Sequence, residues 1–143
     1  MNQNLMYFPC LAMMILTFFV MIRMFLMRVQ AVKNKDITMS YFKTYNTGMA
    51  PALMIQADRH FVNLFEAPVL FYMVCAFSVI TFQVNSSLLI AAWIYVLLRS
   101  IHSVIHLTSN KIRMRMMAYT LSWIVLLYMG LSLGYKLLQV SAS

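Results

Sequence analysis

Charged side chains are scarce in this chain of 143 residues. Only 10% of its residues are charged, and Asp and Glu together number 3. A soluble domain usually carries about 25% charged residues, because its surface must meet water. With 63% of residues hydrophobic and a mean hydropathy of +0.79, this chain has too few polar residues to form a hydrated surface on all sides. The composition excludes an ordinary soluble protein and predicts one membrane domain over residues 1–143.

The basic residues, which give a net charge of +8, do not indicate a nucleic-acid partner. They lie between long apolar runs and form no basic stripe with interleaved aromatic residues. The two cysteines, Cys10 and Cys75, lie inside apolar runs, and we expect free thiols there rather than a disulfide. The N-terminal tail has neither a basic segment nor a cleavage pattern, so we expect the first apolar run to be retained.

Four apolar runs are long enough to cross a bilayer, which requires about 20 residues in a helix. In hydrocarbon the backbone must satisfy its own hydrogen bonds, so we expect helices. The predicted spans cover residues of about 5–32, 58–83, 88–108 and 114–136.

The links between these runs differ in charge. The first link carries Lys33, Lys35 and Lys43, and the third carries Lys111 and Arg113, whereas the second link is uncharged. Because basic residues concentrate on the cytoplasmic side, we expect both termini outside and the first and third links inside. A bacterial inner membrane is favoured over an organelle membrane.

Polar residues also occur inside the predicted spans, where a charge costs roughly 3 kcal/mol or more. Arg59, Asn63 and Glu66 have the spacing i, i+4 and i+7, which predicts one shared helix face. Glu66 is the chain's one glutamate.

A second polar group, on the third span, has the spacing i, i+3 and i+7 and comprises Arg99, His102 and His106. Arg115 and Tyr119 begin the fourth span, and Arg28 ends the first at the same predicted level. All four spans therefore bring polar groups to one layer on the cytoplasmic side. Such a cationic layer suits a small anionic ligand that also carries an ammonium group, with an apolar ligand entering from the bilayer.

Simpler interpretations of these residues remain open. In this interpretation Arg28 only extends its charge to the membrane surface, and Arg99 with Glu66 forms a buried ion pair that fixes helix packing. His102 and His106 have the i, i+4 spacing of a zinc site, but no third ligand accompanies them, and we expect no metal.

Two segments resemble the MAPEG family, the membrane-associated proteins of eicosanoid and glutathione metabolism. Residues 59–68, RHFVNLFEAP, are similar to the family's Arg-x-x-x-Asn-x-x-Glu signature, and residues 99–119 to its passage from span three to span four. The resemblance implies a homotrimer of four-helix protomers, like the microsomal glutathione transferases, with glutathione as co-substrate between subunits. It assigns Arg115 as the catalytic residue that stabilises the thiolate. The glutathione-binding residues it implies are Arg28, Arg59, Asn63, Glu66, Arg99, His102, His106 and Tyr119.

Three positions depart from this family pattern. His106 stands where several members have a tyrosine, Met116 where prostaglandin E synthase has a serine, and Val62 where that enzyme has an arginine. These differences argue against an eicosanoid-specific activity and leave glutathione chemistry intact.

The leading hypothesis is a membrane-bound glutathione-dependent transferase or peroxidase that acts on apolar electrophiles or lipid hydroperoxides. The alternative is a non-catalytic lipid-binding or scaffold protein on the same fold. A small proton antiporter with a lone membrane glutamate is disfavoured, because the arginines around Glu66 would repel cationic drugs.

Overall fold

The computed structural model of the chain describes residues 1–45 and 50–141, and those residues form helices and no strands. Four segments are long and apolar enough to cross a membrane: Gln3–Lys33, Ala52–Ile80, Ser86–Leu107 and Ile112–Ser141. The all-α fold with four membrane-length segments is therefore confirmed.

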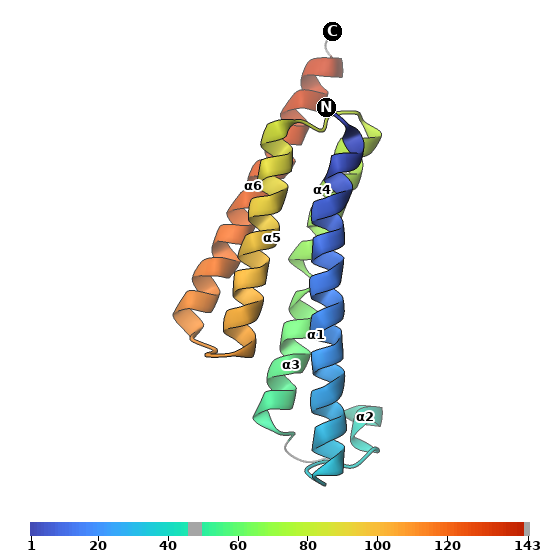
Figure 1. Cartoon of the computed structure of the whole chain (residues 1–143), viewed down its shortest axis with the longest axis vertical. Coiled ribbons are helices and arrows are strands. Elements are labelled where there is room, and N and C mark those ends of the chain that lie inside the picture. The colour runs from blue at the N-terminus through green and yellow to red at the C-terminus, as the bar shows by residue number, and fades with distance from the viewer. Residues whose placement is uncertain (46–49, 142–143) are drawn as a thin grey trace.

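Five helices and one short 3-10 helix make up these segments, and one further short helix, α2, lies between the first two. In chain order they are η1 (Gln3–Met6), α1 (Tyr7–Lys33), α2 (Tyr41–Thr44), α3 (Ala52–Asn63), α4 (Ala67–Ile80), α5 (Ser86–Leu107) and α6 (Ile112–Ser141). Figure 1 shows α5 and α6 as a hairpin beside α1, α3 and α4. Both chain ends lie at one end of the bundle, while α2 and the turn between α5 and α6 lie towards the other.

The second span is not the continuous helix that the spacing of Arg59, Asn63 and Glu66 predicts. α3 ends at Asn63, and α4 begins at Ala67 after a turn in which Glu66 has φ −92° and ψ −94°. Pro68 supplies the physical reason, because it has no N–H to donate to the carbonyl of Leu64 and its ring crowds that carbonyl. Glu66 therefore does not share a helix face with Arg59 and Asn63.

The core lies where α1, α4, α5 and α6 meet. Met13, Phe71, Tyr95 and Met129, one from each helix, are fully buried there. The rings of Phe71 and Tyr95 stack with centroids 4.5 Å apart and an angle of 10° between planes. Between membrane helices such contacts stabilise the bundle through close packing, because lipid tails are as apolar as the core.

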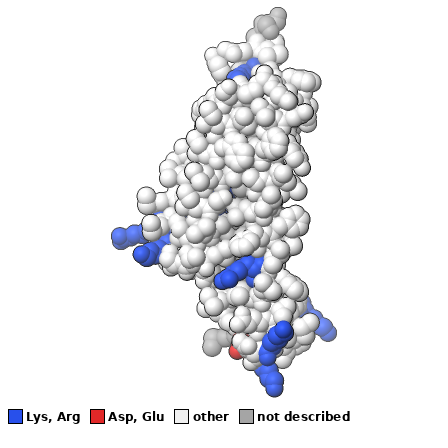
Figure 2. Space-filling view, in the orientation of Figure 1, with Lys and Arg blue, Asp and Glu red and all other residues white. Residues whose placement is uncertain are grey.

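The outer surface is apolar over most of its length. Large hydrophobic side chains are exposed on every membrane-length helix, including Phe18, Phe77, Leu97 and Leu127. Figure 2 shows Lys and Arg gathered over the part of the molecule away from the termini, with one basic group near the end that holds them. This distribution fits a protein surrounded by lipid, with most of its charged side chains towards one end.

We expect Phe71→Ala to lower the free energy of unfolding by about 3 kcal/mol, because it removes a fully buried ring and leaves a cavity. Phe77→Ala, on the same helix but exposed, should lower it by less than about 1 kcal/mol. The measurement is unfolding in mixed micelles titrated with dodecyl sulfate, followed by circular dichroism. Equal losses in the two variants would contradict the role of Phe71 in the core.

Candidate functional site

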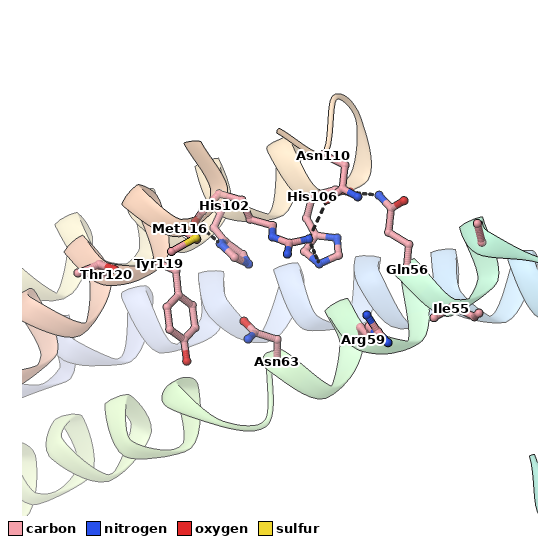
Figure 3. Close-up of a pocket in the computed structure, with 12 residues that line it drawn as sticks. Ile55, Gln56, Arg59, Asn63, His102, His106, Asn110, Met116, Tyr119 and Thr120 are labelled. Atoms are coloured by element: carbon pink, nitrogen blue, oxygen red, sulfur yellow. Dashed lines mark hydrogen bonds between the residues drawn. The ribbon is translucent and has the colours of Figure 1, made fainter. Parts of the chain in front are cut away.

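A polar pocket of about 880 Å³ lies between α3 on one side and α5 with α6 on the other. Figure 3 shows polar side chains from all three helices directed into it. The pocket is lined by Ala52, Ile55, Gln56, Arg59, Asn63, His102, His106, Asn110, Arg115, Met116, Tyr119 and Thr120.

Most of the site residues predicted from the sequence meet at this pocket. The spacing of Arg99, His102 and His106 predicted a common face of the third span, and all three side chains are buried on the inner face of α5. The predicted residues that line the pocket are Arg59, Asn63, His102, His106, Arg115 and Tyr119. Arg28, Glu66 and Arg99 do not line it.

Arg115 is the most constrained cation of the pocket. Its Nη1 donates to Oδ1 of Asn110 at 2.8 Å and lies 3.3 Å from Nε2 of His106, which accepts in the neutral ring. Its backbone carbonyl accepts from Nδ1 of His102 at 3.1 Å. Within the described residues the guanidinium is thus held through Nη1, and Nη2 and Nε are the donors that a ligand can use.

Asn110 is a site residue that the sequence reasoning missed. It lies in the turn between α5 and α6 with a positive φ of 46°, and its N–H donates to the carbonyl of Ile105 at 2.8 Å. Asparagine adopts this left-handed conformation more readily than most residues and commonly follows a helix end. The signal in the sequence was an asparagine at the end of a long apolar run.

Gln56, also missed, joins α3 to this turn, because its Nε2 donates to the backbone carbonyl of His106. The contact closes the pocket where α3 meets the end of α5 (Figure 3). A single glutamine gave no sequence signal, since the partner is a main-chain atom.

Arg99 lies behind the pocket wall and is completely buried. Its Nη2 donates to the backbone carbonyl of Asn63 at 2.9 Å and to Oδ1 of Asn63 at 2.7 Å. Its Cζ lies 5.6 Å from the centroid of the Tyr119 ring, a cation–π contact. Arg99 therefore satisfies the carbonyl at the end of α3 and orients the Asn63 amide.

The buried ion pair between Arg99 and Glu66 does not form. Asn63 lies between them, because its Nδ2 donates to Oε2 of Glu66 at 3.2 Å while its oxygen faces Arg99. Glu66 is exposed on the outer surface of the helix bundle, since the helix break at Pro68 turns it away. The arginine and the carboxylate are thus linked through one amide.

Arg28 does not join the polar layer. Its Nε donates to Oδ1 of Asp58 at 2.9 Å, and its Cζ lies 5.6 Å and 5.9 Å from the ring centroids of Phe42 and Tyr45. These contacts tie the end of α1 to α3 and to α2. Asp58 gave no functional signal in the sequence, because its partner lies on another helix.

His60 is a third imidazole that the spacing of His102 and His106 did not reveal. It is fully buried on α3, on the face that also buries Met54 and Ala57. Its ring centroid lies 4.5 Å from that of His106 and 5.8 Å from that of His102. The described residues nevertheless contain no group of three His, Cys, Asp or Glu side chains arranged to hold a metal ion.

The fold and the pocket together define a multi-pass membrane protein with a cationic pocket between helices. The sequence pattern of the MAPEG family matches residues 6–135. The chain therefore belongs to the MAPEG family. No curated protein matches the chain, and no solved structure matches it either.

The backbone at Asn110 provides a test of the turn that carries the Arg115 anchor. We expect Asn110→Val to lower the free energy of unfolding by about 1–2 kcal/mol, because a β-branched residue is strained at positive φ. Asn110→Gly removes the same side chain but adopts this φ freely, and it should cost less than about 1 kcal/mol. Unfolding of both variants in dodecyl sulfate separates the cost of backbone strain from that of the lost side-chain contact. Equal free energies of unfolding for the two variants would contradict the strain at this position.

Proposed function

We propose that this protein is a membrane-bound glutathione-dependent transferase or peroxidase that acts on apolar electrophiles or lipid hydroperoxides. Membership of the MAPEG family supports a function of the glutathione-transferase or eicosanoid-metabolism type. The observation that carries the proposal is the position of Arg115 on the pocket wall, where Asn110 and His106 hold Nη1.

The charge of the pocket suits the ionised groups of glutathione. This tripeptide carries two carboxylates and one ammonium group at neutral pH. Arg59, exposed on the pocket wall, would pair with a carboxylate, and Asn63 would hydrogen-bond the peptide. Arg99 acts through Asn63 by orienting its amide. His102, His106 and Tyr119 line the same space and complete the binding surface.

Glu66 and Arg28 support assembly into a homotrimer as part of the proposal. Both lie outside the pocket of their own protomer, yet Glu66 is an exposed carboxylate within a membrane-length segment. A carboxylate is costly in hydrocarbon. A neighbouring protomer packed there would shield Glu66 and let it bind the glutathione ammonium, with Arg28 serving a carboxylate at the same interface.

Arg115 would promote the chemical step by stabilising a thiolate. A guanidinium beside the sulfur lowers the pKa of the glutathione thiol and so increases the nucleophilic form. The thiolate then attacks the electrophile and displaces its leaving group. With a hydroperoxide it attacks the outer oxygen and releases the alcohol, and a second glutathione converts the sulfenic acid to glutathione disulfide and water.

The apolar co-substrate would enter from the bilayer. Ile55 and Met116 belong to the pocket wall and are exposed on the protomer, so they would contact the acyl or aromatic part of the substrate. The basic links support a cytoplasmic position for this end of the bundle under the positive-inside rule. The reaction would thus join a soluble thiol from the cytoplasm with a lipid-soluble partner.

Replacing Arg115 tests the chemical role. We expect Arg115→Ala to reduce the rate of glutathione conjugation to chlorodinitrobenzene by at least about 10²-fold, because it removes the charge that stabilises the thiolate. Arg113→Ala, an exposed arginine on the same helix, should keep a rate close to that of the original protein. The assay is the absorbance of the conjugate with purified protein in detergent. Equal rates for both variants would exclude the assigned role.

Glutathione binding separates the enzyme from the alternative, a lipid-binding or scaffold protein. We expect isothermal titration of the purified protein with glutathione to show saturable heat. Asn63→Ala should weaken this binding by roughly tenfold, the effect of losing about 1.4 kcal/mol from hydrogen bonds to the peptide. Absence of heat with the original protein would leave the lipid-binding function.

A further inference from the structure

The two cysteines of the chain meet at a second cavity. Cys10 on α1 and Cys75 on α4 both line a cavity of about 690 Å³. Gln3 and Tyr7 also line it, so it lies at the end of the bundle where the chain begins (Figure 1). It shares no lining residue with the pocket of Arg115.

The cavity has the chemistry of a site for an acyl chain. Met6, Phe8, Val79 and Ile80 provide apolar walls, and of these Phe8 and Ile80 are exposed on the outer surface. Gln3 adds a polar amide at the N-terminal end. An apolar molecule in the surrounding bilayer can therefore reach Cys10 without crossing a polar surface.

The thiols are arranged as an unequal pair. Both cysteines are free, both line the same cavity, and Cys10 packs against the core cluster that contains Cys75. Cys10 is partly exposed, whereas Cys75 is buried, with 2% of its surface accessible. An oxidant in the cavity would thus reach Cys10 first, and Cys75 borders the same space.

We propose that Cys10 and Cys75 form an oxidisable dithiol that an apolar hydroperoxide, entering from the bilayer, converts to a disulfide between α1 and α4. The sulfur of Cys10 attacks the outer oxygen of the hydroperoxide, which releases the alcohol and leaves Cys10 as a sulfenic acid. The sulfur of Cys75 then attacks that sulfur and expels water. In sum, two thiols and one hydroperoxide give one disulfide, one alcohol and one water.

This reaction is independent of the proposed glutathione chemistry. It uses neither Arg115 nor a soluble thiol, and it takes place at the end of the bundle away from the polar pocket. Its product is a covalent bond between two helices that pack against each other in the core. Exposure to peroxidised lipid would therefore leave a disulfide between α1 and α4 in the protein.

The test treats the reduced protein with linoleic acid hydroperoxide, without glutathione. Matched samples receive phosphatidylcholine hydroperoxide in nanodiscs, or hydrogen peroxide. Each sample is then alkylated and weighed by intact mass spectrometry. With both lipid hydroperoxides we expect loss of 2 Da and of both alkylation sites, at least about tenfold faster than with hydrogen peroxide. Disulfide formation with the free acid alone would restrict the oxidant to free fatty-acid hydroperoxides, and formation with the phospholipid would include membrane lipid itself.

Single variants assign the two roles. We expect Cys75→Ser to stop at a gain of one oxygen on Cys10, and Cys10→Ser to leave Cys75 unoxidised. Ala76→Phe, which fills the cavity at an exposed lining position, should slow the reaction with lipid hydroperoxide and leave that with hydrogen peroxide unchanged. Arg115→Ala should oxidise like the original protein. Circular dichroism of each variant confirms the fold.

Three results would overturn the inference: no disulfide with any oxidant, equal rates with lipid and hydrogen peroxide, or independent oxygen gain at each cysteine without pairing. None of these outcomes bears on the binding of glutathione at the other pocket, so the two proposals stand or fall separately.

Discussion

The backbone polar groups in the membrane-length part of this chain must find their partners inside the protein, because hydrocarbon offers none. The helices meet this requirement for the backbone. Where Pro68 interrupts the second span, the side chain of Arg99 binds the carbonyl of Asn63 at the end of α3. The same guanidinium fixes the amide of Asn63 and, through it, Glu66. One buried arginine thus stabilises the helix break and arranges the polar groups around it.

The polar side chains of the pocket are likewise positioned by contacts within the protein. Arg115 is held by Asn110 and by His106, and His106 is held in turn by Gln56 through its backbone carbonyl. Each contact joins a different pair of elements, so α3, α5, α6 and the turn between α5 and α6 must all be in place before the guanidinium is positioned. A cation that is oriented in advance stabilises developing charge without reorganisation at the moment of reaction, which is the property our proposed function requires.

The two ends of the bundle differ in chemistry. One holds arginines, imidazoles and amides around a polar pocket, and the other holds two thiols beside an apolar cavity. In a bilayer, the proposed soluble anion would reach the first from the aqueous side, and the proposed lipid hydroperoxide would reach the second from the hydrocarbon. Because the two sites lie at opposite ends of the bundle, the two proposed reactions would proceed independently in one short chain.

Length and hydropathy by themselves determined the four membrane-length helices, because each is a local property of about 20 residues. The i, i+3, i+7 pattern likewise placed Arg99, His102 and His106 on one inner face. Tertiary structure alone decided which groups touch. It brought His60 against His106, tied Arg28 to Asp58, separated Arg99 from Glu66 by Asn63, and brought Cys10 and Cys75 to one cavity. These contacts link different elements, and their geometry follows from how the helices pack and where Pro68 breaks the second span, which no local pattern encodes.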